Sequence, residues 1–458
     1  MPVPSRWSDI RIQGGLSYIP GEGPFWQGTE ARPTGWWHPK AVLAADFLNL
    51  RCMRGSTEIA LASALATTRS SAHLLANAAG VYQSFAANAL AASAGVGAYI
   101  GGQITNMAYP SADLSDPRWV KTGLSVSAKS VAVLGASANA ALTEDGSTGS
   151  HGATMGSAPR PISTAGLHTA FFGLEAGTRR FVQCVAGGGL TSCFITIDTQ
   201  TWTVTETAGA QYVAHRLLGP YAGGARILEM TVNNAGAYAV ALAINGSGTG
   251  TPGIAAPSYA GNGSTIICWG IGATPGRFFG PCIPTTAGTA TRYASDVKAI
   301  ASGGEPFAGF AVNALGAAMS MLAAINLSRL GDGVVRHVAE LSDGTSGNRL
   351  RLFIDTDDKA AAQVVSGGTV LATAKLGSAL VAGRGVLAAN FDPANGLYLV
   401  RKSGLQDAAA NFGAVPAGLN LLKLGSGQGG LYLNDIVEQV QVCRALTQAE
   451  ARGWVQAA

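Results

Sequence analysis

The chain has few charged residues for its length. Lys, Arg, Asp and Glu make up 12% of its 458 residues, and the formal net charge is only +4. This share is about half the usual one for globular proteins. No run of Lys or Arg stands out, so the electrostatic footprint of a nucleic-acid-binding surface is missing and we expect no nucleic-acid partner. Because a surface with few charges has little protection against association, we expect a homo-oligomer or another assembly that buries part of it.

Signals for export and membrane insertion are also missing. The first residues contain no cationic stretch followed by an apolar one, which a secretion signal would require. The segment 89–110 is uncharged and apolar, but it is broken by glycines and too weakly hydrophobic for a membrane helix. We therefore expect no membrane insertion and a protein that is made in the cytoplasm and stays soluble there.

The cysteines and histidines form no recognisable catalytic or metal-binding pattern. The six cysteines contain no Cys-x-x-Cys pair, so we expect no zinc site. Cys184 and Cys193 could face each other across a hairpin, but cytoplasmic assembly favours reduced thiols, and we expect free, mostly buried cysteines. The six histidines are scattered, and the sequence has no His-Glu-x-x-His, no Gly-x-Ser-x-Gly and no Walker loop.

Acidic residues supply the remaining candidates for catalysis. A polysaccharide depolymerase of the hydrolase type needs two carboxylates placed about the glycosidic bond. Most acidic residues of this chain are expected at strand ends or turns, where Asp favours the local backbone geometry. The candidates are Asp113, Asp116, Glu144, Asp145, Glu175, Asp198, Glu206, Asp355, Asp357, Asp358 and Asp392. They form no recognisable pair, so we expect that the protein is not an enzyme, with a depolymerase as the less favoured alternative.

One acidic cluster could bind a metal ion. Asp355, Asp357 and Asp358, in the segment IDTDDK, offer hard oxygen ligands of the kind that suits Ca²⁺. The cluster lacks the partnering Asn and Gly spacing that would make the signal specific, and Asp-rich turns are common. The sequence therefore predicts no metal and no cofactor, and Ca²⁺ at these three residues is the alternative.

Hydrophobic residues and glycine are abundant, and the hydrophobic pattern alternates. Hydrophobic residues make up 47% of the chain, which also contains 62 glycines. The segments 181–185 and 201–207 alternate between an apolar or aromatic face and a polar, often hydroxyl-bearing face, as half-buried strands do. In the last third of the chain, strand-like runs recur about every 8 to 14 residues between turns. These patterns predict an all-β protein with two antiparallel β-sandwich (jelly-roll) domains, at 104–297 and 298–458.

The N-terminal segment is rich in tryptophan and proline. Four of the eight tryptophans, Trp7, Trp26, Trp36 and Trp37, lie in the first 37 residues. The prolines among them prevent a regular helix or a long strand. Large aromatic side chains on an irregular segment usually become ordered by docking on another surface. We interpret residues 1–103 as an irregular attachment arm followed by a connector; packing of the arm against the chain's own next domain is the alternative.

Four phrases follow one another along residues 65–297. They are TTRSSAHLLANAAGVYQSFAANALA from Thr67, GGQITNM from Gly101, SADLSDPRWVKTGLSVSA from Ser111 and CWGIGATPGRFFGPCIPTTAGTATRYASD from Cys268. Their order resembles a module of structural and adhesion proteins of tailed bacteriophages. In those proteins similar phrases flank a carbohydrate-binding-like jelly roll. The resemblance implies such a jelly roll at 104–297.

The end of the chain carries a second resemblance. The segment from Leu431, LYLNDIVEQVQVCRALTQAEARGWV, is similar to the last strands and terminal helix of concanavalin-like and laminin-G-like lectin folds. Within it, Thr447 and Glu450 have the Thr-x-x-Glu spacing of a capping box, which predicts a short helix. The resemblance implies a concanavalin/laminin-G-like sandwich at 298–458.

The phage resemblance also implies a function. It indicates a virion protein of a phage or gene transfer agent, a head or tail fibre or spike, that is assembled in the host bacterial cytoplasm. Such a protein would attach to other virion proteins through Trp7, Trp26, Trp36 and Trp37, bind host-surface polysaccharide, and form a homo-oligomer, commonly a trimer. A capsid or tail decoration protein that binds no glycan is the alternative.

Sugar-binding residues are expected among the aromatic residues of the first sandwich. Sugar recognition uses aromatic faces against the apolar side of the ring and planar polar groups for the hydroxyls. Trp202, Tyr212 and Tyr221 are the candidates for carbohydrate binding. Trp119 and Trp269, in the opening and closing phrases, are expected in the core instead.

Overall fold

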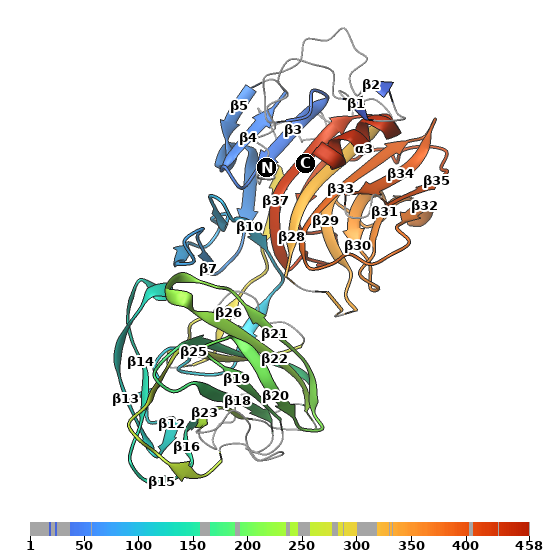
Figure 1. The fold of residues 1–458 in the computed structure, drawn as a ribbon. Helices are drawn as coiled ribbons and strands as arrows, with labels where there is room; N and C mark the ends of the chain where they lie inside the picture. Colours follow the sequence, from blue (N-terminus) through green and yellow to red (C-terminus); the bar gives the residue numbers. More distant parts are fainter. Residues whose placement is uncertain are drawn as a thin grey trace. The chain divides into compact units, whose positions relative to one another are not determined.

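The computed structural model describes most of the chain and divides it into two compact units (Figure 1). The described residues are 18–19, 23–24, 37–55, 57–155, 165–187, 193–234, 239–245, 257–276, 283–286, 288–299, 318–328, 330–331, 333–402, 406–428 and 430–457. The terminal unit comprises 1–70, 87–102 and 294–458, and the central unit comprises 71–86 and 103–293. Both units consist almost entirely of antiparallel strands, which confirms the all-β sandwich fold.

The described strands of the central unit form two six-stranded sheets. The β18 sheet has the order β12 (Trp119–Thr122), β16 (His151–Met155), β23 (Ala239–Asn245), β18 (Phe181–Gly187), β19 (Phe194–Asp198) and β20 (Thr203–Ala208). The β17 sheet has the order β13 (Leu124–Val131), β14 (Ala136–Glu144), β25 (Thr265–Pro275), β17 (Gly166–Glu175), β22 (Arg226–Asn234) and β21 (Tyr212–Leu218).

Short elements complete the central unit. They are the hairpin β7 (His73–Ala76) with β8 (Tyr82–Phe85), the pairs β11 (Ile104–Asn106) with β26 (Ala290–Arg292) and β15 (Thr148–Gly149) with β24 (Tyr259–Ala260), and the 3₁₀ turns η2 (Ala132–Leu134) and η3 (Ala222–Gly224).

Alternate residues of the two central sheets fill the core between them. Phe172 and Leu174 of β17 and Val182 and Cys184 of β18 belong to one cluster and are all inaccessible to solvent. Burying a large apolar side chain of this kind contributes roughly 1.5–3 kcal/mol. The period-2 pattern that predicted strands in this region therefore also selects the residues that form the core.

Both tryptophans of the opening and closing phrases are buried, as expected. The indole of Trp119 donates a hydrogen bond to the carbonyl oxygen of Pro110 at 2.8 Å. Trp269 packs edge-on against Phe171, with ring centroids 5.7 Å apart, on the other face of the β17 sheet. Gly173 of the neighbouring strand makes room for this indole, because a Cβ at that position would overlap the ring.

The terminal unit is a second sandwich. Its β37 sheet contains β35 (Gln406–Ala410), β34 (Gly396–Arg401), β33 (Gly383–Asp392), β28 (Met319–Leu327), β37 (Asp435–Arg444), β3 (Ala41–Asp46), β4 (Arg51–Arg54) and β5 (Thr57–Ala60) in this order, with β10 (Gly97–Ile100) and β9 (Ala92–Ser93) added beside β37. Its β30 sheet has the order β32 (Thr369–Lys375), β31 (Ala360–Ser366), β30 (Arg349–Ile354), β29 (Arg336–Ser342), β36 (Leu421–Leu424), β27 (Asp296–Ala299) and β6 (Leu65–Thr68). The pair β1 (Tyr18–Ile19) and β2 (Gly23–Pro24) and the single turn α1 (Leu61–Ala64) are also part of this unit.

The structure divides the first hundred residues differently from the sequence-based prediction. That prediction placed 1–103 in an arm and a connector and began the last domain at 298. In the structure, β3 pairs with β37, with Ala44 opposite Gln441, and β6 pairs with β27. Strands from both ends of the chain thus complete the same two sheets. The strand β3 is buried along its whole length, with β4 on one edge and β37, from the far end of the chain, on the other.

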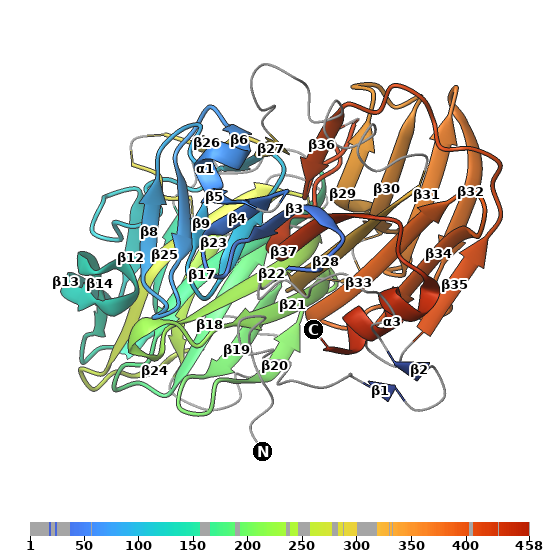
Figure 2. The same cartoon turned by 90° about the horizontal axis from the view of Figure 1, so that it is seen from above.

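The helix predicted from the capping box is present. α3 (Gln448–Ala457) begins after Thr447, whose side-chain oxygen accepts a hydrogen bond from the Glu450 N–H at 3.1 Å, and the Glu450 carboxylate accepts one from the Thr447 N–H at 2.7 Å. The helix packs on β33 and β34 through Trp454 (Figures 1 and 2). Trp37 is half-buried against the same cluster. Trp37 thus contacts the chain's own terminal unit, and its role in virion attachment stays a prediction; Trp7, Trp26 and Trp36 lie outside the described residues.

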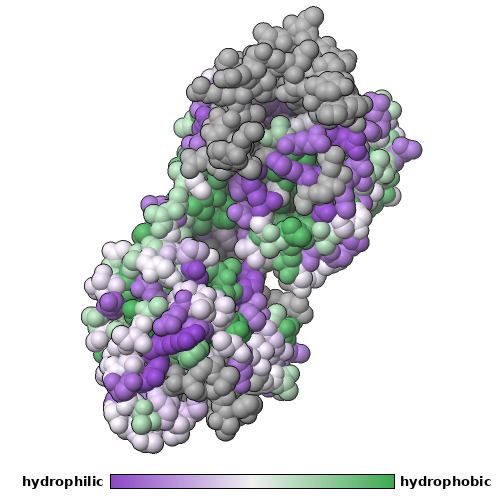
Figure 3. Space-filling model, in the orientation of Figure 1, coloured by the Kyte–Doolittle hydropathy of each residue, from purple (hydrophilic) through white to green (hydrophobic). Residues whose placement is uncertain are grey.

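The described surface and interior agree with the composition. The face in Figure 3 shows hydrophilic residues among residues of intermediate and high hydropathy. This mixture is expected for a chain in which only 12% of the residues are charged. Five cysteines are free and buried, Cys52, Cys184, Cys193, Cys268 and Cys443, while Cys282 lies outside the described residues. Within the described part of the chain, no helix has the length and hydrophobicity to span a membrane.

Candidate functional site

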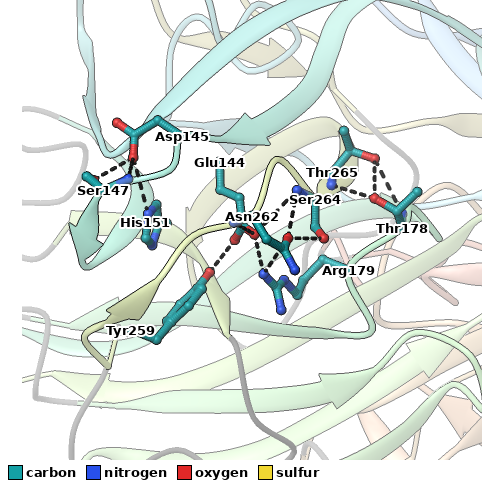
Figure 4. Close-up of polar contacts among 10 residues, drawn as sticks. All are labelled: Glu144, Asp145, Ser147, His151, Thr178, Arg179, Tyr259, Asn262, Ser264 and Thr265. Carbon is teal, nitrogen blue, oxygen red and sulfur yellow. Dashed lines mark hydrogen bonds and ion pairs between the residues drawn. The ribbon is translucent and has the colours of Figure 1, made fainter.

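A buried carboxylate gathers several loops at one end of the β17 sheet. The side chain of Glu144, the last residue of β14, is fully buried. Its carboxylate accepts hydrogen bonds from the Tyr259 hydroxyl at 2.6 Å, the Asn262 N–H at 2.9 Å and the Ser264 N–H at 3.3 Å. It also forms an ion pair with Arg179 (Figure 4). We call these five residues the Glu144 group.

The charges within the Glu144 group favour an ionised carboxylate. Burial opposes ionisation of Glu144, but the hydrogen bonds from Tyr259 and the Asn262 N–H and the charge of Arg179 outweigh it, so its pKa lies below the ordinary value. Burial and the neighbouring Glu144 raise the pKa of the Tyr259 phenol, which therefore stays a hydrogen-bond donor. The Arg179 guanidinium carbon lies 5.1 Å from the Tyr259 ring centroid, within the range of a cation–π contact.

The group presents polar atoms at the surface. The side-chain oxygen of exposed Asn262 accepts hydrogen bonds from Arg179 at 3.1 Å and from the Ser264 hydroxyl at 2.6 Å. Its amide Nδ2 donates to no group in the described part of the chain. The hydroxyls of Thr178 and Thr265 lie 3.2 Å apart beside it (Figure 4). An amide, a guanidinium, hydroxyls and a half-buried tyrosine ring are the groups that bind sugar hydroxyls and the apolar face of a sugar ring.

A second polar pair supports the same loop. Exposed Asp145 accepts hydrogen bonds from the Ser147 N–H and hydroxyl, and its Oδ1 lies 3.4 Å from Nε2 of buried His151. The His151 and Tyr259 rings are 4.7 Å apart. Gly261 passes so close to them that a Cβ would overlap the Asp145 carbonyl oxygen. Glycine is therefore required at this position for the close approach of two backbone segments.

The three aromatic residues predicted to bind carbohydrate lie at separate places. Trp202 occupies a left-handed position (φ 54°) in the turn before β20, where the Arg226 guanidinium lies 5.5 Å from its ring centroid. Tyr212 begins β21, and its hydroxyl is 2.7 Å from Nδ1 of His215. Tyr221 follows the other end of β21.

Packing leaves each of these three residues only partly exposed. Trp202 and Tyr212 are partly buried against the central core. Tyr221 stacks on Tyr82, with ring centroids 6.1 Å apart, and burial raises its pKa to about 12. None of the three belongs to the Glu144 group, and their sugar-binding role stays a prediction.

Sequence reasoning named Glu144 and Asp145 only as two of many carboxylates, and it missed Arg179, Tyr259 and Asn262. These residues come from three separate segments, so their spacing along the chain carries no motif. The Gly-Asn-Gly-Ser run at 261–264 marks a turn. The sequence of this turn does not reveal that the Glu144 carboxylate, at the end of β14, accepts hydrogen bonds from it.

Two of the three aspartates considered as Ca²⁺ ligands form ion pairs with lysines. Lys375 Nζ lies 2.5 Å from a carboxylate oxygen of Asp355 and 2.9 Å from one of Asp357, and Lys359 also pairs with Asp357. Asp358 accepts the Gly331 N–H instead. Within the described residues no group of three or more His, Cys, Asp or Glu side chains is arranged to hold a metal ion. Ca²⁺ binding here stays a prediction that would require displacing Lys375.

No protein-family model matches the sequence, and no curated protein matches it. Among solved structures, the chain is similar to the Ruminococcus gnavus IT-sialidase CBM40, with 15% identity, 30% of this chain and 83% of that chain covered, and a TM-score of 0.26. It is similar to a K499G mutant of NanB sialidase from Streptococcus pneumoniae, with 10% identity, coverage of 32% and 25%, and a TM-score of 0.27. It is also similar to domains LG4-5 of the mouse laminin alpha1 chain, with 10% identity, coverage of 79% and 94%, and a TM-score of 0.22.

Proposed function

We propose that this chain is a glycan-binding adhesion protein and that the Glu144 group binds a sugar. The observation that carries this proposal is the buried Glu144 carboxylate, which fixes Arg179, Tyr259 and the backbone of Asn262 in one arrangement. Donors held in place before a ligand arrives lose little conformational entropy on binding. The Asn262 amide, with no acceptor in the described part of the protein, is then free to donate to a sugar hydroxyl.

Binding without cleavage is part of the proposal. Glu144 accepts four hydrogen bonds and its pKa is held low, so it is not suited to donate a proton to a glycosidic oxygen near neutral pH. Asp198 is likewise engaged, by Arg180 at 2.6 Å. These contacts support a binding module over a depolymerase.

The finer proposal is a head or tail fibre or spike of a phage or gene transfer agent that binds host polysaccharide. It is supported by the order of the phrases from Thr67, Gly101, Ser111 and Cys268, and by the low share of charged residues, which favours assembly. In this proposal the protein is a homotrimer in the virion, and the tryptophan-rich N-terminal segment joins it to other virion proteins. A decoration protein without glycan binding is the second candidate.

Replacing Asn262 by Asp is expected to weaken glycan binding about tenfold, the equivalent of one hydrogen bond of ~1.4 kcal/mol. The substitution keeps an acceptor for Arg179 and Ser264 but removes the amide donors. Binding of the full chain is measured on an array of bacterial capsular and lipopolysaccharide-derived glycans, and the affinity for a positive glycan is then determined by calorimetry. Asn233→Asp, at an exposed asparagine near the end of β22, is the matched control and should bind as the unaltered protein does.

Two outcomes would decide against this function. If the unaltered protein binds no glycan of the array or of the host surface, the decoration protein is favoured. If incubation with host polysaccharide yields shorter oligosaccharides, the protein is a depolymerase. Equal affinity of the Asn262→Asp and Asn233→Asp variants would remove the Glu144 group as the binding site.

Deleting residues 1–36 is expected to leave both units folded but to abolish incorporation into particles. The cut preserves Trp37, His38 and Lys40, which contact the terminal unit in the structure. Copy number is measured by quantitative mass spectrometry of purified particles, and folding by the thermal unfolding of the free protein. Truncated protein present at the normal copy number would show that attachment depends on another part of the chain.

A further inference from the structure

A row of polar residues crosses the outer face of the β30 sheet in the terminal unit. Directly paired positions on six neighbouring strands carry Lys298, Lys423, Glu340, Arg351, Gln363 and Thr373 in this order. We call them the Arg351 row. The alternate residues Leu350 and Leu352 of β30 lie in the core, so the row lies on the opposite face of the sheet.

Hydrogen bonds join the middle of the row. The Arg351 Nε donates to the side-chain oxygen of Gln363 at 2.9 Å, and the Gln363 amide donates to the Thr373 hydroxyl at 3.0 Å. The Arg351 Nη1 lies 3.1 Å from Nε2 of His337. The guanidinium carbon stacks 4.1 Å from the ring centroid of buried Phe353. Arg351 is thus held in one orientation by neutral partners and an aromatic ring.

The carboxylates near the row are already engaged by other cations. Asp296 pairs with Lys298 at 2.8 Å and lies 3.5 Å from Lys423. Glu340 lies 3.4 Å from Arg349 Nη1 and accepts the Gln428 N–H at 2.7 Å.

Arg351 is therefore left without an ion pair. In the described part of the chain no carboxylate lies within ion-pair distance of it. Burial lowers the pKa of His337, so this neighbour is neutral at pH 7. Burial and the charge of Arg349, against opposing effects of Glu340 and Asp355, lower the pKa of Arg351 to about 10, at which it is still a cation near neutral pH. A half-buried cation with no carboxylate in direct contact favours the binding of an anion, because the two nearest carboxylates, Glu340 and Asp355, pair with Arg349 and Lys375.

We propose that the Arg351 row binds a carboxylate or sulfate group of an acidic polysaccharide. The planar guanidinium is suited to grip such an oxyanion with two parallel N–H groups. The Thr373 hydroxyl, whose oxygen accepts from Gln363, has its own proton left to donate to a neighbouring sugar oxygen. This site lies in the terminal unit, uses none of the Glu144 group, and does not depend on the glycan specificity of the central unit.

Arg351→Met tests the proposal. Methionine keeps an unbranched apolar stem against Phe353 but removes the charge. We expect at least a tenfold loss of affinity of the full chain for polygalacturonate or chondroitin sulfate, measured by calorimetry at low salt, and weaker binding of the unaltered protein as salt rises. Arg444→Met, at the exposed end of β37, removes the same charge from the other sheet and should leave the affinity unchanged. Neutral dextran and inorganic sulfate separate binding of an acidic polymer from general sugar or small-anion binding.

Two substitutions at Thr373 keep the test valid if Arg351→Met disturbs folding. Thr373 is exposed on the edge strand β32, so Glu and Lys are tolerated there. Thr373→Glu is expected to abolish binding of the acidic polymers, and Thr373→Lys to strengthen it. Equal affinity of both Thr373 variants would overturn the proposal, as would binding of dextran as tight as that of polygalacturonate. Because Asn262→Asp leaves the Arg351 row intact, failure of one site is recognised independently of the other.

Discussion

Replacing Glu144 by Gln is expected to destabilise the central unit by about 3 kcal/mol. The substitution removes the negative charge that pairs with the mostly buried Arg179 cation, and it replaces one of the two acceptor oxygens of the carboxylate by an amide donor. Urea unfolding of the full chain gives the change in free energy, and hydrogen exchange assigns it to the peptides of the central unit. Peptides covering 259–264 should lose their protection first, because Glu144 holds this loop.

Glu206→Gln is the control for this experiment. Glu206 is partly exposed on β20 and accepts one hydrogen bond, from the Thr196 hydroxyl at 3.2 Å. Its substitution should cost less than ~1 kcal/mol. If both variants unfold at the same urea concentration, the Glu144 group contributes no more than an ordinary surface contact, and the argument for a pre-arranged binding site loses its basis.

Acidification from pH 6.5 to pH 4 is expected to remove up to ~3 kcal/mol of stability from the terminal unit through His38. His38 is only 3% exposed. Its pKa is lowered to about 4, chiefly by burial and against an opposing effect of Glu450. Between the ordinary pKa of 6.5 and this value the unfolded chain binds a proton that the folded chain does not. The contribution of His38 is therefore complete above pH 6.5 and is lost as the pH falls through 4.

His38→Asn separates this effect from other acid-sensitive groups. Asparagine can keep an acceptor for the Lys40 N–H, which lies 3.1 Å from Nδ1 of His38. The free energy of unfolding, measured by urea titration at several pH values, should vary less steeply between pH 6.5 and pH 4 in this variant. Burial also lowers the pKa values of His168, His215 and His337, so part of the slope will remain. An unchanged slope would mean that His38 is solvated or already protonated in the folded protein.

Features encoded over a few residues could be predicted from the sequence. The alternation of 181–185 identifies a strand with buried Val182 and Cys184, and the spacing of Thr447 and Glu450 identifies the start of α3. These signals are local because side-chain direction and capping depend on neighbours within about four residues. The all-β class follows from many such local signals.

Pairings over long distances could not be predicted in the same way. The partner of β3 is β37, and the Glu144 group joins β14, the turn with Arg179 and the loop at 259–264. No periodicity relates these segments. The aromatic residues Trp202, Tyr212 and Tyr221 were selected by residue type, which does not distinguish a ring at a core edge from one at an open surface.

The insertion of the central unit within the terminal unit sets an order of events during synthesis. The backbone N–H of His38 donates to the side chain of Gln441, 403 residues later. At a translation rate of about 5–20 residues per second, β3 waits roughly 20–80 s for its partner β37. The central unit can fold meanwhile, since both of its sheets are complete by residue 293. Until β37 has been synthesised, the nascent chain therefore exposes the edge of the buried strand β3 that β37 will cover, which makes this period the one in which chaperone protection matters most.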